Sequence, residues 1–180
     1  MKFVLLLLVA LNATATPLLT PKQQLEAVAS EVGFDLSHIT VLKVPLNEYL
    51  RGAACSPTLI VTNANLWDIE GNAKNFVHIM HEVGHVLGLL HNNGIMRVRY
   101  QDEPLDINRT AMSTPSPEPL RALIFRNHYI QEMKYRLRTR ANASMFWYSN
   151  DFPVKPLDKD TCLNVLASPD RWGDILIDWR

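Results

Sequence analysis

The stretch HEVGHVLGLLHNNGIM, residues 81–96, constrains the fold more than any other part of this 180-residue chain. It continues an apolar stripe whose members are separated by four, three, four and three residues, namely Phe76, Met80, Val83, Leu87 and Leu90. This is the spacing of one face of an α-helix that packs on a core. We therefore predict a helix from about residue 72 to residue 87, buried along the stripe and polar elsewhere.

The histidine spacing within this stretch predicts a metal site. His81 and His85 lie one helical turn apart, so both imidazoles leave the same side of the helix and can reach one ion. Gly88 can adopt a positive φ, end the helix and turn the chain so that His91 supplies a third ligand. Three neutral imidazoles leave a fourth position open for water, which is typical of catalytic zinc. Glu82 lies beside such a site, where a general base is needed.

The pattern HExxHxxGxxH over residues 81–91 resembles the extended zinc-binding motif of the metzincin metallopeptidases, and Gly94-Ile95-Met96 resembles their Met-turn. The resemblance implies an α+β, zincin/metzincin-like fold, with a reduced twisted sheet and the active-site helix in an upper half and an irregular, helix-containing lower half. It implies one Zn²⁺ held by the three histidines, with Glu82 as catalytic residue and Met96 beneath the ligands. Met112 is the alternative methionine, and small matrixin-like enzymes are closest in pattern.

The function implied by the resemblance is that of a zinc-dependent endopeptidase. A zinc-bound water, activated by Glu82, would hydrolyse peptide bonds of a protein or peptide substrate. Two alternatives stay open, namely a non-catalytic interaction protein on a metalloprotease fold and a zinc hydrolase that acts on another kind of bond. The zero net charge gives no electrostatic reason to expect a nucleic-acid partner.

Two further groups of residues are interpreted more simply. His78 is interpreted as a surface histidine, because the ligand set is complete without it, with a metal ligand or a hydrogen-bond donor beside the metal site as the alternative. The segment 121–140 carries six basic residues against one acid, Glu132. It is interpreted as a solvated helix face, with a docking face for an acidic surface as the alternative.

The first fifteen residues have the composition of a secretory signal peptide. Met1-Lys2 is basic, residues 3–11 are apolar but too short to cross a bilayer, and Ala13-Thr14-Ala15 has the form of a cleavage site. We therefore expect residues 1–15 to be removed, leaving residues 16–180 as one secreted catalytic domain with 141–180 as a C-terminal extension of unknown role. No later stretch has the apolar length of a transmembrane segment.

The expected secretion predicts the state of the two cysteines. In an oxidising compartment Cys55 and Cys162 are expected to form a disulfide, the alternative for Cys55 being a latency ligand of the zinc. Asn108 and Asn142 begin glycosylation sequons.

Local patterns predict the remaining elements. A capping box at residues 20–23 and a glycine at position 33 bound a first helix. β-Branched residues predict strands at 39–44 and 58–62, and residues 47–56 are expected to connect them. The proline-rich segment 98–119 is expected to be irregular. A third helix is predicted over 120–140, and short strands are predicted near 146–148 and 175–177.

Overall fold

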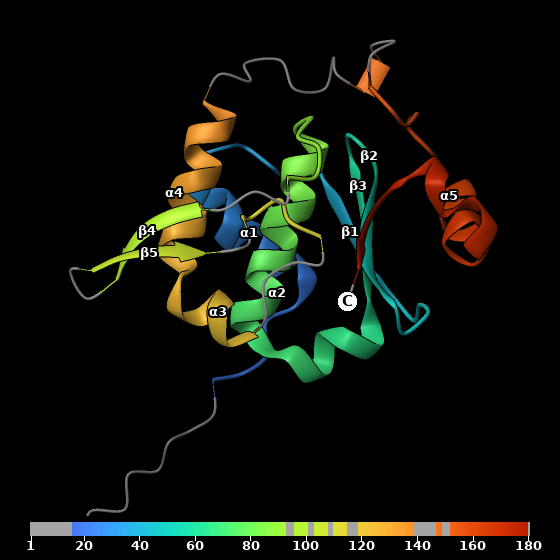
Figure 1. The fold of residues 1–180 in the computed structure, drawn as a ribbon. Helices are drawn as coiled ribbons and strands as arrows, with labels where there is room; N and C mark the ends of the chain where they lie inside the picture. The colour runs from blue at the N-terminus through green and yellow to red at the C-terminus, as the bar shows by residue number, and fades with distance from the viewer. Residues whose placement is uncertain are drawn as a thin grey trace, which may run out of the picture.

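The computed structural model describes residues 16–92, 96–100, 103–107, 110–114, 119–138, 147–148 and 152–179. They form an α+β fold, which confirms the predicted class at this level (Figure 1). The elements are α1 (Pro21–Val32), β1 (Thr40–Val44), β2 (Leu50–Ser56), β3 (Leu59–Asn63), α2 (Ala64–Val86), β4 (Met96–Tyr100), β5 (Glu103–Ile107), α3 (Pro119–Ile124), α4 (Arg126–Leu137), α5 (Lys159–Leu166), the 3₁₀-helix η2 (Pro169–Asp174) and β6 (Leu176–Trp179).

A four-stranded mixed sheet in the order β1-β3-β2-β6 divides the molecule. β1 and β3 are parallel, whereas β2 runs antiparallel to both of its neighbours. α1 and α2 cover one face of the sheet and α5 lies on the other (Figure 1). Each face therefore has its own core, and α2 is packed between the sheet and the helices α1, α3 and α4.

The sequence prediction for residues 47–56 is wrong, because residues 50–56 form the interior strand β2. Gly52, Ala53 and Ala54 lack the β-branched side chains that identify a strand in sequence. They form one nevertheless because β3 and β6 supply hydrogen-bonding partners on both sides. Their small side chains also let α2 and α5 approach the two faces closely.

A capping box and a glycine set the two ends of α1, and another glycine interrupts α2. The predicted capping box is present, since Thr20 accepts from the Gln23 N–H and the Gln23 side chain accepts from the Thr20 N–H. Gly33 follows with a φ of 81°. α2 contains a break at Gly71, whose φ of 76° and ψ of 170° separate a first segment from the predicted helix that follows it.

The middle of the chain departs from the prediction in two places. The helix expected over 120–140 is two helices, α3 and α4, interrupted at Phe125. The segment expected to be irregular contains a hairpin of β4 and β5. Met96, Val98 and Tyr100 alternate there with arginines, and this two-residue period is a strand pattern that the prolines obscured.

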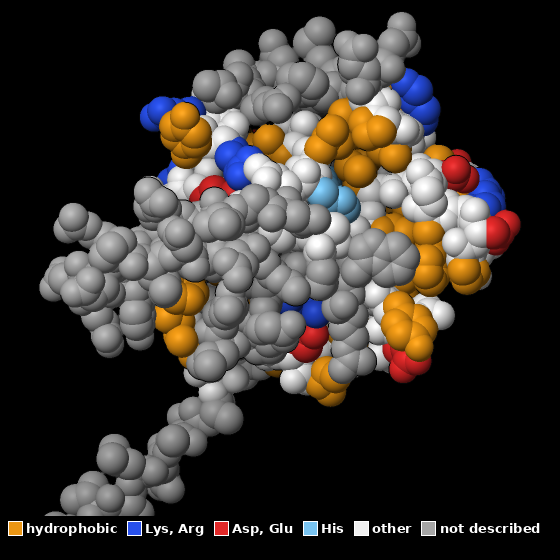
Figure 2. Space-filling view, viewed as in Figure 1, with side chains coloured by type: hydrophobic (Ala, Val, Ile, Leu, Met, Phe, Trp, Pro, Cys, Tyr) orange, Lys and Arg blue, Asp and Glu red, His pale blue; other side chains and the backbone are white. Residues whose placement is uncertain are grey.

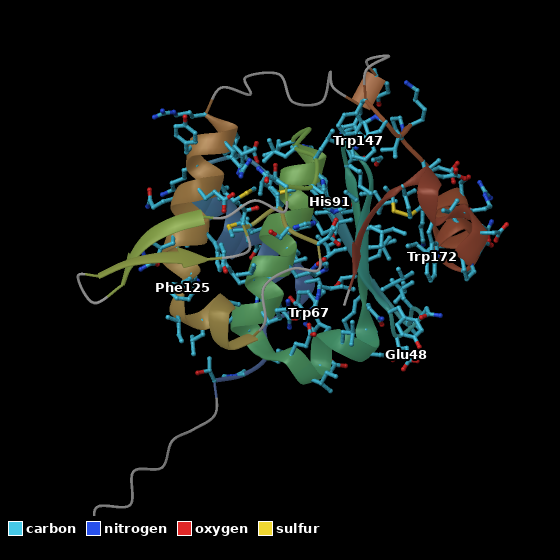
Figure 3. All side chains as sticks on the ribbon, in the orientation of Figure 1. Glu48, Trp67, His91, Phe125, Trp147 and Trp172 are labelled. Carbon is cyan, nitrogen blue, oxygen red and sulfur yellow. A yellow bond between two sulfur atoms is a disulfide. The ribbon has the colours of Figure 1, made fainter. Side chains whose placement is uncertain are left out.

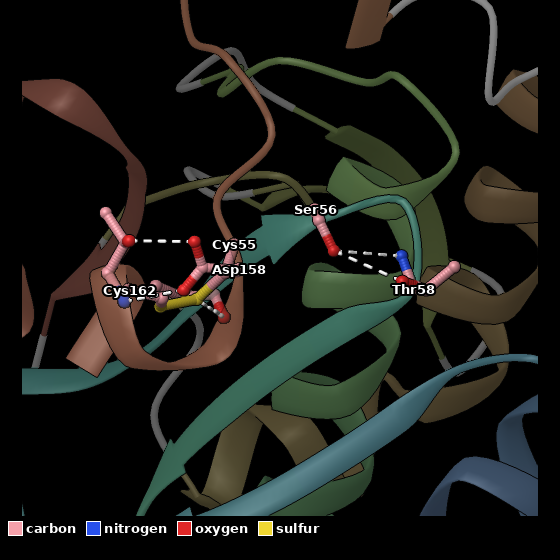
Figure 4. Close-up of a disulfide and its surroundings, with 7 residues drawn as sticks. Cys55, Ser56, Thr58, Asp158 and Cys162 are labelled. Carbon is pink, nitrogen blue, oxygen red and sulfur yellow. Dashed lines mark hydrogen bonds between the residues drawn. A yellow bond between two sulfur atoms is a disulfide. The ribbon is translucent and has the colours of Figure 1, made fainter.

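Described residues of the segment 141–180, interpreted above as a C-terminal extension, contribute to both cores. Residues 176–179 add β6 to the edge of β2, so the strand predicted near 175–177 is present. Trp147 and Tyr148 lie in a helical turn instead of the expected strand. α5 packs on the outer face of the sheet, where the predicted disulfide joins Cys162 to Cys55 of β2 (Figure 4).

No helix within the described ranges is both long enough and apolar enough to cross a membrane. The predictions for residues 1–15, Asn108 and Asn142 lie outside the described residues.

The disulfide closes a loop between residues 107 positions apart, so its removal is expected to stabilise the unfolded chain. Replacing both buried cysteines, C55A/C162A, should lower the free energy of unfolding by about 2–4 kcal/mol. Urea denaturation of the oxidised protein and the double variant measures the difference. The same unfolding free energy in both would contradict a stabilising role for this bond.

Candidate metal centre

Three imidazole nitrogens converge at the C-terminal end of α2. The Nε2 atom of His85 lies 3.0 Å from Nε2 of His81 and 3.1 Å from Nε2 of His91. His81 and His85 are buried, and His91 is partly exposed. Figure 3 labels His91 near the centre of the visible face, and Figure 2 shows histidine atoms there at the surface beside hydrophobic side chains. The group therefore has a path to solvent.

In each of the two buried rings, the hydrogen bond of Nδ1 fixes the direction in which Nε2 points. Nδ1 of His81 lies 2.9 Å from the Ala111 carbonyl oxygen, and Nδ1 of His85 lies 2.7 Å from that of Leu89. A carbonyl oxygen only accepts hydrogen bonds, so each Nδ1 carries the proton. Each neutral ring then presents an Nε2 lone pair to the shared space.

Burial keeps these rings neutral. It lowers the pKa of His81 to about 4, lowers that of His85 well below the ordinary value, and also lowers that of His91. Two lone pairs 3.0 Å apart with no proton between them repel one another. Ligands of a tetrahedral ion at about 2.0–2.1 Å are roughly 3.3 Å apart, so a divalent cation between the three nitrogens fits this spacing. These residues can hold a metal ion.

Gly88 produces the turn that delivers His91. Its φ is 82°, the left-handed conformation that the sequence analysis expects at this position. The Gly88 N–H donates to the His85 carbonyl and the Leu89 N–H donates to that of Gly84, which ends the helix. The same turn brings the Leu89 carbonyl to His85 Nδ1, so it orients one ligand while it positions the next.

A second turn, residues 110–113, supports the group from the other side. Besides the Ala111 carbonyl at His81, its Met112 carbonyl accepts from the N–H of Asn92, the residue after His91. Glu132 of α4 accepts from the Ala111 N–H at 2.7 Å and pairs with Arg136 at 2.6 Å. α4 therefore holds the turn that orients two parts of the metal centre.

Met112 also explains a glycine inside α2. A Cβ atom on Gly84 would collide with Met112 Sδ and Met133 Cε, so any other residue would require the two methionine side chains to shift. The structure thus brings Met112, the alternative Met-turn residue, against the ligand helix. Met96 begins β4, and its side chain lies outside the described residues.

Glu82 is buried next to the ligands without an ordinary hydrogen bond. Neither carboxylate oxygen accepts one from the residues that the structure describes. Burial raises the pKa of Glu82 well above its ordinary value, and the charge of Asp178 acts in the same direction, while the charge of Arg51 opposes them. A carboxylate with such a high proton affinity can take a proton from water.

The prediction of a surface position for His78 is wrong. Its ring is buried under β2 and β3, with Nδ1 3.0 Å from Asp178 Oδ2 and Nε2 3.1 Å from Thr62 Oγ1. Burial alone would raise the pKa of Asp178, but His81, His78 and Arg51 together hold it below its ordinary value. Asp178 stands almost a hundred residues from the histidines, so no local sequence pattern links it to them.

The basic residues of α4 are partly neutralised within the protein. Arg126 pairs with Glu31 at 3.1 Å and stacks over the Phe76 ring at 4.0 Å, and Arg136 pairs with Glu132. An acidic docking partner for segment 121–140 stays a prediction.

Comparison with protein-family models, curated proteins and solved structures gives no match.

The anchoring role of Glu132 leads to a testable prediction. Glu132→Ala leaves the Ala111 N–H without its acceptor, so the turn should hold His81 less firmly and Zn²⁺ affinity should fall about 10–100-fold. Glu132→Gln is the matched control, because its amide oxygen can still accept from Ala111. Competition with a chromophoric chelator measures both, and wild-type affinity in Glu132→Ala would contradict the role.

The depressed histidine pKa values also predict how stability depends on pH. His78, His81, His85 and His91 have lowered pKa values in the fold, whereas unfolded histidines titrate near 6.5. Below pH 6.5 the unfolded state therefore binds more protons, and Glu82 offsets only one of the four.

The metal-free protein should accordingly lose stability as the pH falls from about 6.5 towards 4, the value to which the pKa of His81 is lowered. Urea denaturation with a chelator at about pH 7.5 and about pH 5 tests this. His38→Ala, at an exposed position, should show the same loss. Equal or greater stability at the lower pH would show that the buried rings do not resist protonation.

Proposed function

We propose that this chain is a zinc-dependent endopeptidase of the metzincin type. The observation that carries the proposal is the convergence of three imidazole Nε2 atoms, with the Glu82 carboxylate buried one residue from the first of them and accepting no hydrogen bond from the described residues. A merely structural histidine cluster has no need of an unsatisfied carboxylate beside it, because burying one without a partner is costly.

Zinc is the ion that suits this donor set. Three neutral nitrogen ligands with no thiolate favour a borderline ion such as Zn²⁺, and they leave a coordination position free. When bound, zinc would act as a Lewis acid that polarises a peptide carbonyl and acidifies water. His81, His85 and His91 would hold it, and the hydrogen bonds to Ala111 and Leu89 would keep the first two rings in the required tautomer.

Glu82 would perform the proton transfers. Its carboxylate takes a proton from water as the water oxygen attacks the carbonyl carbon, and passes that proton to the amine nitrogen as the C–N bond breaks. Its raised proton affinity suits a group that must hold a proton between these two steps. The water is consumed, and Glu82 returns to its starting state.

The arrangement around the site supports the family assignment. The sheet and α2 would correspond to an upper half, and the turn at residues 110–113 together with α4 would correspond to a lower half, while α5 and β6 return to the sheet. Because Met112 packs on the ligand helix, we assign the Met-turn role to this residue. The disulfide and the signal-like N-terminus support secretion.

The test is proteolysis by the mature, oxidised protein. Unstructured protein should be cleaved in the presence of zinc, and a chelator should abolish the cleavage. Glu82→Gln should lower kcat by about 10²–10⁴-fold while zinc stays bound at one ion per chain. His85→Ala should lose both zinc and activity, with His38→Ala as the matched histidine control.

The alternative functions give different results. Zinc binding without cleavage of any unstructured protein would favour an interaction protein or a hydrolase of another bond. Undiminished cleavage by Glu82→Gln would remove that residue from the mechanism.

A further inference from the structure

One row of the sheet beneath α2 contains a gap. Gly52 of β2 is paired with Thr62 of β3 on one side and with Asp178 of β6 on the other. Side chains of directly paired residues lie on the same face of a sheet. Because glycine has no side chain, the row leaves a space between Thr62 and Asp178.

The imidazole of His78 fills this space. A Cβ atom on Gly52 would lie only 2.8 Å from Cε1 and Nε2 of the ring. Nδ1 donates to Asp178 Oδ2 at 3.0 Å, since a carboxylate can only accept, and Nε2 of the neutral ring accepts from the Thr62 hydroxyl at 3.1 Å. Residues of β6 and β3 thus hold the two ends of the ring, over the glycine of β2 between them.

Glu82 lies one helical turn further along the same side of α2. Its Oε1 atom is 3.7 Å from Nδ1 of His78, close enough for contact but too far for an ordinary hydrogen bond. Both carboxylate oxygens are buried. A flexible side chain in such a position gains a defined orientation only from the groups packed against it.

We propose that His78 and Asp178 are positioning residues that hold the Glu82 carboxylate where it takes its proton from water. The inference rests on the proposed peptidase function and deepens it. Arg51 lies 3.5 Å from Asp178 and is paired with Glu70. The charge of Asp178 is therefore balanced by Arg51, and this balance needs no contact with Glu82. His78 acts through the Glu82 carboxylate that it contacts, and Asp178 acts through His78.

A double-mutant cycle tests whether Asp178 acts through Glu82. The mature protein is loaded with Co²⁺, and acetohydroxamic acid, which chelates a metal and can give its hydroxyl proton to a neighbouring base, is titrated by visible absorption. Asp178→Asn should weaken binding of this probe about tenfold. In the Glu82→Gln background the same substitution should change the affinity for the probe less than about twofold, because the carboxylate that Asp178 positions is already absent.

Glu70→Gln is the matched control, since it removes the other carboxylate paired with Arg51 but not the contact with His78. It should leave probe binding unchanged, and Co²⁺ affinity should be unchanged in Asp178→Asn. If Asp178→Asn does not fold, Thr62→Val, which releases the far end of the ring, carries the same cycle with a smaller loss.

Loss of probe affinity to the same extent in both backgrounds, or no loss in the wild-type background, would overturn the positioning role. A protein that binds the probe but cleaves no unstructured protein would refute the peptidase function alone, and the cycle would still decide the role of Asp178. A protein that does not bind Co²⁺ would refute both.

Discussion

Two hydrogen bonds from imidazole Nδ1 atoms to backbone carbonyls set the geometry of the candidate metal centre. They hold His81 and His85 in the tautomer whose Nε2 lone pairs point at one another. The carbonyl at His85 comes from the turn that Gly88 makes, and the carbonyl at His81 comes from a turn that α4 holds. The candidate centre therefore depends on the turn at residues 110–113 and on α4, although its three histidines lie within eleven residues of sequence.

On the side of α2 that faces the sheet, a row of polar groups is buried. An unpaired charge would be costly there. Arg51 balances Asp178 and Glu70, and His78 joins Asp178 to Thr62. Glu82 lies beside this network, and neither of its carboxylate oxygens accepts a hydrogen bond from the described residues. Asp178 reaches the network because β6 pairs with β2, and the disulfide fixes α5, which precedes β6, to the same strand.

Residue patterns predicted the elements whose signals are local. The capping box and Gly33 bounded α1, β-branched residues located β1 and β3, and the apolar stripe located the main part of α2. β2 was missed because glycine and alanine carry little strand preference, and its partners are β3 and the distant β6. The break at Phe125 was missed because the apolar spacing continues across it, and nothing in this segment marks the end of a helix.

The sequence by itself determined that His81, His85 and His91 converge, since helical geometry places positions 81 and 85 on one side and a glycine at 88 permits the turn to 91. It also determined the disulfide, because the chain has only two cysteines. Only the tertiary structure decided that His78 is buried, that Met112 packs on Gly84, and that Asp178 stands beside the proposed base. These contacts join residues up to a hundred positions apart. They are created by strand pairing and helix packing, which short-range spacing does not encode.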